Sequence, residues 1–345
     1  MREPKYIKIG DYTLEEILER HLHWLNRDCE NWESMRADLH DADLHNANMS
    51  NANMRGADMH GANMSCADLC SANMRGADIR DTNMCGANMR SANMMGANMM
   101  GADMHGANMS YANMNSANMS YANMSNANLR GANMMGADMH SANMSCANMS
   151  NADMHDANMM GANMSYANMH SANMSCANMS YANMHSANMS CADLRSANMR
   201  GADIRDTNMI DTNMIDVDLR GANMIDADMR GTNLHDVDMR SADKLRKGIK
   251  LSEPIIGWKK CKNNVLVKLE IPRGAIVFSI NNSKCRTDKA KVLEIIGSDR
   301  AYSKYKFFSY YVGDIIEVFN FNCEYNVECA EGIHFFKTKE EAKNY

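Results

Sequence analysis

Three residues in the last third of the chain have side chains that could take part in covalent chemistry: Cys285, Cys329 and His334. A cysteine thiolate is a nucleophile and an imidazole can serve as its base, provided that the two side chains lie within hydrogen-bond reach. The sequence does not show such proximity, because a buried strand cysteine and a histidine bonded to its neighbours would give the same residues. An unrecognised enzymatic activity of this region is therefore one of three hypotheses about function.

The cysteines do not have the spacing of a metal site or of a disulfide framework. Cys261, Cys285, Cys323 and Cys329 contain no pair with the short gap of a zinc knuckle. The chain has 11 cysteines and 38 methionines, and the remaining cysteines are not placed to pair with one another. Outward thiols and oxidisable methionines are typical of a reducing compartment. We therefore expect a cytoplasmic protein without a metal or another cofactor.

A basic cluster lies in the same region, formed by Lys284, Arg286, Lys289 and Lys291. Residues 242–345 carry 19 Lys and Arg against 13 Asp and Glu, so the cluster could contact phosphate groups. A solvated strand face is the commoner explanation of such a cluster. We keep nucleic-acid contact as a hypothesis for this region and do not expect it in the rest of the chain.

A long repeat precedes the part of the chain that contains these residues. From Ala37 to Ser241 the sequence repeats every five residues without an insertion, which gives 41 units in 205 residues. The first residue of a unit is Ala in most cases, the second is Asp or Asn in every unit, and the third is Met, Leu or Ile in every unit. A period of five fits neither a helix nor a strand, so each unit must be a short extended piece followed by a corner. Ala and Met then face inward, and the corner falls mostly on Gly, Ser, Asn or Asp.

Units such as Ala37-Asp38-Leu39-His40-Asp41 and Ala87-Asn88-Met89-Arg90-Ser91 resemble those of the pentapeptide-repeat family. The resemblance implies a right-handed, four-sided parallel β-solenoid of about ten coils with four units in each. The chain differs from the family in using Met where Leu or Phe is usual, and Met adapts its shape more freely in a core. The part after the array resembles an uncharacterised domain that follows such arrays in bacterial and phage proteins, in the stretches 256–260, 284–286, 289–293 and 329–336. No known activity comes with that resemblance.

The whole chain is thus predicted to be mainly β, with three parts at residues 1–36, 37–243 and 244–345. Thr13-Leu14-Glu15-Glu16 is a capping-box pattern and predicts a helix from about Leu14 to Asn26, with Trp24 and Trp32 over the first coil. The last part is expected to be a small mainly β or mixed α/β domain, with strands at 265–271, 275–280, 291–296 and 314–319 and a helix that begins near Thr338. We expect no signal segment and no membrane span.

The charge of the array bears on function, because some members of the family are understood to mimic duplex DNA and to bind topoisomerases such as gyrase. The array carries 11 Arg and 21 Asp, or about one net negative charge per coil. Duplex DNA carries one charge per about 1.7 Å, nearly three over the rise of one coil. In addition, 12 of the 13 Asp in second positions are followed two residues later by His or Arg. We interpret this as local neutralisation, although copied units would also carry the pairing by descent.

The end of the array is its most charged part and is the candidate surface for a partner. Units four apart should stack, which aligns three arginines on one side and places several aspartates at nearby corners: Arg200, Arg220 and Arg240, with Asp206, Asp216, Asp226 and Asp236. Solvated corners are the simpler explanation of these residues. We predict a non-enzymatic binding scaffold whose protein partner is unknown. The second hypothesis is a DNA mimic that modulates gyrase or another type II topoisomerase.

Overall fold

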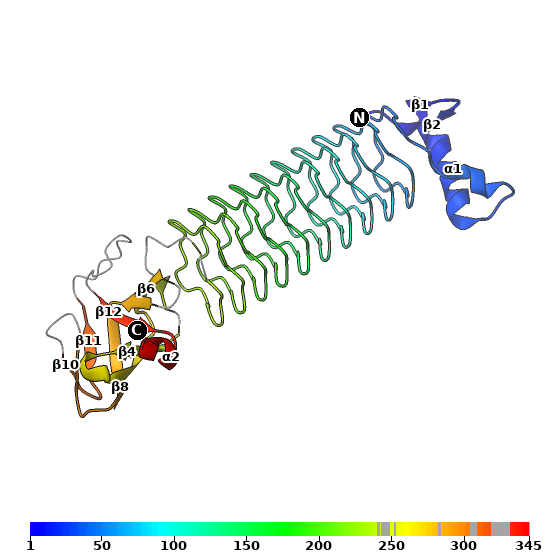
Figure 1. Cartoon of the computed structure of the whole chain (residues 1–345). Coiled ribbons are helices and arrows are strands. Elements are labelled where there is room, and N and C mark those ends of the chain that lie inside the picture. Colours follow the sequence, from blue (N-terminus) through cyan, green and yellow to red (C-terminus); the bar gives the residue numbers. More distant parts are fainter. Residues whose placement is uncertain are drawn as a thin grey trace.

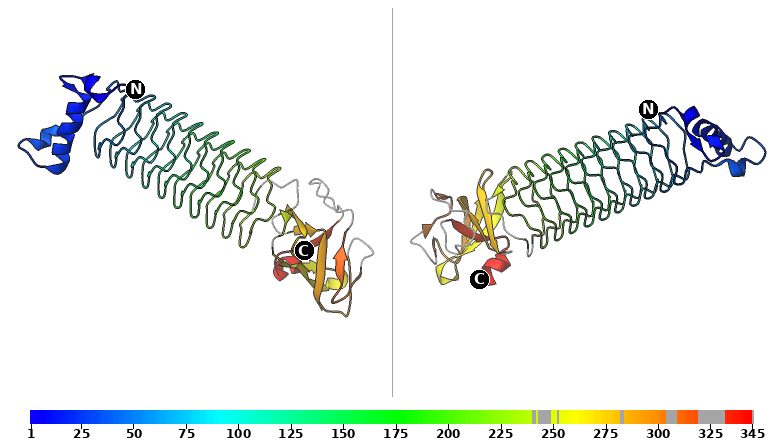
Figure 2. Two further views of the ribbon diagram at one scale, coloured as in Figure 1. Left: turned by 180° about the vertical axis from the view of Figure 1, so that it is seen from behind. Right: turned by 90° about the horizontal axis from the view of Figure 1, so that it is seen from above.

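The chain folds as a rod with a different structure at each end. The computed structural model describes residues 1–239, 242, 249–251, 253–281, 284–303, 309–318 and 332–344. The N-terminal helix and the C-terminal sheet lie at opposite ends of the rod (Figure 1), and two further views agree (Figure 2).

The rod is a stack of square coils. Each second-position residue forms a parallel bridge with the residue 20 positions later, from Asp38 with Asp58 through to Asp218 with Asp238. Four units therefore complete one turn. In the described units through residue 236, the fifth residue lies at a corner in the left-handed conformation, as at Asn51 with a φ of 60°. Gly, Asn and Asp tolerate this conformation at little cost, which explains why they fill so many corners.

The hydrogen bonds of one unit explain why its second residue is always Asp or Asn. In the unit 142–146, Asn143 N–H donates to the preceding coil (2.9 Å), whereas Met144 and Cys146 N–H donate to the next coil (2.7 and 2.9 Å). Ala142 N–H donates to the preceding unit of its own coil (3.0 Å). Ser145 N–H instead donates to the Asn143 side-chain oxygen at 3.2 Å. Asp and Asn place a strong acceptor there, so a backbone donor that needs a partner favours these two residue types.

Asparagine side chains also link the coils to one another. The Asn143 amide donates to Asn123 Oδ1 one coil earlier (3.2 Å), and the Asn163 amide donates to Asn143 Oδ1 (3.3 Å). The same bond recurs at many positions along the array, for example from Asn183 to Asn163 (3.2 Å). These ladders run on the outside of the rod, parallel to its axis.

The core of the rod consists of stacked alanines and methionines. Met144 and almost all other third-position side chains are buried, as the sequence predicts. The two ends differ. Leu39 and Leu44 in the first coil are fully buried, whereas Leu234 and Met239 in the last described coil are only half-buried. The N-terminal end of the core is therefore the better covered.

The N-terminal cap explains this cover. It contains η1 (Pro4–Tyr6), β1 (Lys8–Ile9), β2 (Tyr12–Thr13), α1 (Leu14–Asn26) and η2 (Trp32–Met35). The predicted helix and its capping box between Thr13 and Glu16 are confirmed. Ile7, Leu14 and Ile17 join the same core as the methionines of the rod, so the cap and the array form one hydrophobic unit.

A buried histidine fastens the cap to the first coil. His21 Nδ1 accepts a hydrogen bond from Ala37 N–H (3.0 Å), and Nε2 donates to the Arg55 carbonyl (3.1 Å). Burial lowers the pKa of His21, which favours the neutral ring that this pair of bonds requires. Trp24 stacks on His21, and a Cβ added at the first-coil corner Gly56 would lie 3.4 Å from the Trp24 ring, so Trp24 lies over the first coil as predicted.

The C-terminal part is an antiparallel sheet with its own core. The strand order is β11-β8-β5-β4-β12-β7-β6-β3. The strands are β3 (Ile249–Lys250), β4 (Ile255–Lys260), β5 (Leu266–Ile271), β6 (Ile276–Asn281), β7 (Lys284–Thr287), β8 (Lys289–Ile296), β11 (Ile315–Glu317) and β12 (Ile333–Phe336). Beside them lie η3 (Lys262–Asn264), the pair β9 (Ala301–Tyr302) and β10 (Ser309–Tyr310), and α2 (Lys339–Asn344). In the part of the chain that the structure describes, no helix is both long and apolar enough to cross a membrane.

Candidate partner-binding surface

Five aspartates on the outside of the rod are held by the arginine two residues later, as the sequence predicts. Arg80 Nε donates to Asp78 Oδ1 (2.8 Å) and Nη2 donates to Oδ2 (2.6 Å). Hydrogen bonds from Arg80 hold the pKa of the Asp78 carboxyl below its usual value. The other pairs are Asp193–Arg195, Asp203–Arg205, Asp218–Arg220 and Asp228–Arg230. These fork-to-fork contacts neutralise the carboxylates locally.

The histidines that follow an aspartate behave differently. His40 Nε2 lies 3.0 Å from the corner carboxylate of Asp41 and not against Asp38. His45 Nδ1 lies 2.8 Å from Ser65 Oγ in the next coil. The imidazole has a short stem and cannot reach back along the strand as arginine does. The expected neutralisation is thus seen for the arginine pairs and not for the histidine pairs among the described residues.

The charged end of the array is partly neutralised by its own contacts. Arg220 binds Asp218 and also lies 3.7 Å from Asp238 in the next coil. Asp206 lies 3.6 Å from His185. Arg200 and the corner residue Asp216 are exposed, and the corner residue Asp226 is half-buried. Asp236 lies 2.9 Å from His235. Arg240 lies outside the described residues. Arg200, Asp206, Asp216 and Asp236 are all exposed, and Asp206 and Asp236 each lie near a histidine.

Four tyrosines stand at corners in the middle of the rod, and sequence reasoning did not single them out. Tyr111, Tyr121, Tyr166 and Tyr181 are 54 to 62 % exposed and all have φ near 60°. Each ring rests on the next coil. A Cβ at Gly131 would lie 2.7 Å from the Tyr111 ring, and the same is true of Gly201 and Tyr181. Tyr121 and Tyr166 meet His140 and His185 edge to face, with ring centres 5.4 and 5.5 Å apart.

The candidate reactive residues of the C-terminal sheet do not converge. In the pairing of β7 with β12, Cys285 lies opposite Phe335 and Arg286 lies opposite His334. Side chains alternate between the two faces of a sheet, so Cys285 and His334 point to opposite faces. Cys329 lies outside the described residues. The structure therefore gives no support for a thiol and imidazole pair at these two positions.

The predicted basic cluster is also divided. Arg286 is fully buried, whereas Lys289 is half-buried and Lys291 is exposed. Lys289 pairs with Glu317 across β8 and β11, and Lys291 pairs with Glu270 across β8 and β5. The side chain of Lys284 lies outside what the structure describes. The lysines on β8 thus face carboxylates on neighbouring strands, which favours a solvated, neutralised sheet surface.

Comparison with known protein families agrees with the repeating geometry. Pentapeptide repeats match the chain in eight overlapping copies between residues 37 and 243. The chain belongs to the pentapeptide-repeat family. Residues 246–342 match a second family, described as a family of unknown function (DUF5758). No curated protein matches the chain in sequence.

Several solved pentapeptide-repeat structures resemble parts of this member of the family. HetL, a protein involved in heterocyst differentiation regulation from the cyanobacterium Nostoc sp. strain PCC 7120, is 26% identical, with 60% of this chain and 89% of HetL covered and a TM-score of 0.36. QnrB1, a plasmid-mediated fluoroquinolone resistance protein, is 14% identical, with 51% and 86% covered and a TM-score of 0.39. These partial superpositions say nothing about the function of this chain.

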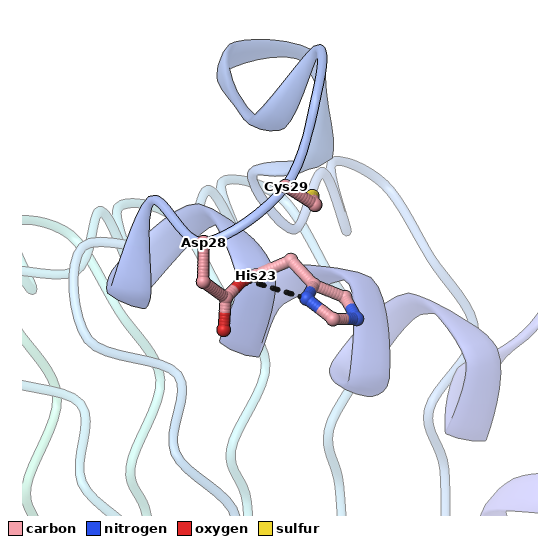
Figure 3. Close-up of side chains that lie close together, drawn as sticks. All are labelled: His23, Asp28 and Cys29. Carbon is pink, nitrogen blue, oxygen red and sulfur yellow. Dashed lines mark hydrogen bonds and ion pairs between the residues drawn. The ribbon is translucent and has the colours of Figure 1, made fainter.

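The cap of this pentapeptide-repeat protein holds a small polar cluster beside α1. His23 Nδ1 lies 2.7 Å from Asp28 Oδ1, and Cys29 Sγ lies 3.6 Å from Met35 Sδ. Figure 3 shows the His23 ring turned toward Asp28, with Cys29 on the loop that follows the helix. The hydrogen bond from His23 lowers the pKa of the Asp28 carboxyl. Because the histidine proton satisfies the carboxylate, the cluster is explained as an anchor for this loop.

Proposed function

We propose that the chain is a non-enzymatic scaffold that binds a protein partner through one side of its rod. In this proposal residues 37–243 form a right-handed rod of about ten coils, residues 1–36 cap its first coil, and residues 244–345 form an accessory domain at its other end. Tyr121, Tyr166 and Tyr181 border the binding side. This surface, the tyrosine side, consists of the outward side chains of residues 121–126, 141–146, 161–166 and 181–186.

The tyrosine side is supported by its composition and rigidity. Its four segments contain no Asp, Glu, Lys or Arg and consist outwardly of Tyr, Asn, Ser, Gly, Cys and one His. Tyr, Ser, Gly and Asn are the residues that dominate antibody binding loops, because a tyrosine offers a large contact area at a low cost in entropy. Here the solenoid already fixes the backbone, and the next coil supports each ring. The observation that carries the proposal is this set of exposed, supported tyrosines on an uncharged surface.

Affinity capture from the cells that naturally make the protein tests the proposal. The baits are the full chain, a variant with Tyr121, Tyr166 and Tyr181 all replaced by Ser, and the control Tyr111→Ser. Tyr111 is a corner tyrosine in another column of the rod. We expect a partner that the full chain and the control retain and that the triple variant loses. Identical sets of captured proteins for all three baits would refute a role of the tyrosine side.

Topoisomerase binding by DNA mimicry is the alternative hypothesis that the family resemblance suggests. Five of the array's aspartates are already bound by arginine, and the tyrosine side carries no fixed charge. A DNA-binding groove selects a continuous negative surface, which this rod does not offer. We therefore expect weak or no inhibition in a gyrase supercoiling assay at neutral pH. Salt-sensitive inhibition that disappears when Asp206, Asp216, Asp226 and Asp236 are reversed would instead establish mimicry by the last coils.

The proposed place of action is the cytoplasm. No disulfide joins the nine cysteines that the structure describes, and four of them are exposed at corners. Exposed thiols survive best in a reducing compartment.

A further inference from the structure

Three metal-ligating side chains meet at a corner of the rod away from the tyrosine side. His155 and Asp156 belong to one coil and Cys176 is the corner residue directly above Asp156 in the next coil. The ligand atoms of the three residues all lie within 4.8 Å of one another. His155 Nε2 and Asp156 Oδ2 are 3.1 Å apart. We propose that this corner is a binding site for a zinc ion, with the ligands His155 Nε2, an Asp156 carboxylate oxygen and the Cys176 thiolate.

The hydrogen bonds of His155 leave its Nε2 lone pair pointing at the carboxylate. His155 Nδ1 lies 3.0 Å from the Ser175 carbonyl oxygen, which can only accept. It also lies 2.9 Å from Ser175 Oγ, whose own proton is donated to Asn173 Oδ1 at 2.7 Å. The proton of a neutral ring therefore sits on Nδ1. Nε2 and Asp156 Oδ2 are then two acceptors 3.1 Å apart, and only a positive species between them, a proton or a metal ion, makes this contact favourable.

Two other corners of the same rod have the same design without the carboxylate. His45, Asn46 and Cys66, and likewise His170, Ser171 and Cys191, have the spacing of His155, Asp156 and Cys176. In both, the Nδ1 atom also bonds a serine of the next coil, at 2.8 and 3.0 Å.

The corner residue is where these sites differ from the proposed one. The Asn46 amide donates to His45 Nε2 (2.7 Å) and the Ser171 hydroxyl donates to His170 Nε2 (3.2 Å). Asp156 is an acceptor when ionised and has no proton to donate. Among these three corners with a cysteine above them, Nε2 is occupied by a donor at two, and only at His155 is it open to a cation.

The ligand set and its dimensions suit zinc. A zinc ion about 2.1 Å from a nitrogen and an oxygen ligand, at an angle near tetrahedral, holds them about 3.0 to 3.4 Å apart. The observed 3.1 Å fits this range without movement of either side chain. Imidazole and thiolate together favour zinc over magnesium or calcium, which prefer oxygen ligands. The bond from Nδ1 to a backbone carbonyl is the outer contact that commonly orients a metal-binding histidine. Three protein ligands leave the fourth position of a tetrahedral ion open to water.

Cobalt titration of the full-length, untagged and reduced protein tests the site. Co²⁺ reports on a thiolate ligand through a charge-transfer absorption in the near ultraviolet, and Zn²⁺ should displace it. Every variant carries Cys29→Ser, which removes the thiol of the cluster in the cap. Asp156→Ser converts the site into a copy of the corner at His170, so that it should fold normally. The reciprocal change Ser171→Asp should build a second site with His170 and Cys191.

The expected result is one cobalt ion bound with a thiolate band in the Cys29→Ser background. Loss of an outer contact alone costs about 10-fold to 100-fold in metal affinity, so Asp156→Ser should weaken binding by at least about 10-fold, and Cys176→Ser should abolish the band. Ser171→Asp should add a second equivalent. An unchanged affinity and band in Asp156→Ser, or no thiolate band in the background variant, would overturn the assignment.

Discussion

The second-position asparagines bond both within and between coils, and Asn143→Ala measures how much the rod depends on one of them. The Asn143 side chain makes three hydrogen bonds: it accepts from Ser145 N–H at 3.2 Å, donates to Asn123 Oδ1 at 3.2 Å and accepts from the Asn163 amide at 3.3 Å. Each bond contributes about 0.5 to 1.5 kcal/mol. The substitution also leaves the half-buried Ser145 N–H without an acceptor. We expect the free energy of unfolding to fall by about 2 to 4 kcal/mol.

Two matched variants separate the parts of this effect. Asn143→Asp keeps the oxygen that accepts from Ser145 and Asn163 but loses the amide that donates to Asn123, so it should cost about 1 to 2 kcal/mol. Ser145→Ala leaves the backbone N–H in place and should change stability by less than about 0.5 kcal/mol. Urea denaturation followed by circular dichroism gives all three values. Asn143→Ala as stable as the native chain, or less costly than Asn143→Asp, would refute the role assigned to the side-chain oxygen.

Three further outcomes follow from the core, the ion pairs and the ends. Met144→Asp should prevent folding, as judged by circular dichroism, because an unpaired buried charge costs several kcal/mol, whereas Met144→Leu should cost less than about 1.5 kcal/mol. The pKa of Asp203 is lowered by its bonds to Arg205, so the pair stabilises the fold at neutral pH and loses this contribution as the pH falls through the lowered pKa. The melting temperatures of the native chain and Arg205→Gln should therefore converge in strong acid, and a constant difference would contradict the pairing. Deletion of residues 1–36 should cause end-to-end association, measured by light scattering, because it exposes the open edge of the first coil. Deletion of residues 244–345 should cause less association, because the last described coil is already partly uncovered. Equal association of both truncated chains would argue against a capping role of residues 1–36.

The architecture of the array could be predicted because its sequence obeys one rule at every unit. Inward Ala and Met, outward Asp or Asn and a corner at the fifth residue all follow from the period and from side-chain alternation. Inner positions behave as expected up to the last described coil, where Leu234 and Met239 are only half-buried. The side-chain oxygen that accepts the fourth N–H was not foreseen, because it depends on the backbone path at the corner.

The candidate sites were less predictable because they depend on residues that are far apart in the sequence. The zinc site joins Asp156 to a cysteine 20 residues later, and no linear spacing rule for metal ligands describes a solenoid. The tyrosines occupy corner positions, which the sequence analysis interpreted only in terms of backbone conformation. In the C-terminal sheet, strands β5, β6, β8 and β11 were found at nearly the right positions. The register of β7 against β12 was not predicted, and this register places Cys285 and His334 on opposite faces of the sheet.

The choice between Asp and Asn in the second position has a physical explanation that covers five of the 12 pairs. Both residues supply the oxygen that accepts the fourth N–H, and they differ only in the remaining atom. In Asn that atom donates to the preceding coil, as from Asn143 to Asn123. In Asp it is a second acceptor, which cannot donate and which brings a charge, so it needs a cation within reach. Arg205 supplies that cation to Asp203 with bonds of 2.6 to 3.1 Å. His40 turns to Asp41 instead, so the geometry accounts for the arginine pairs and leaves descent by duplication as the explanation for the histidine pairs.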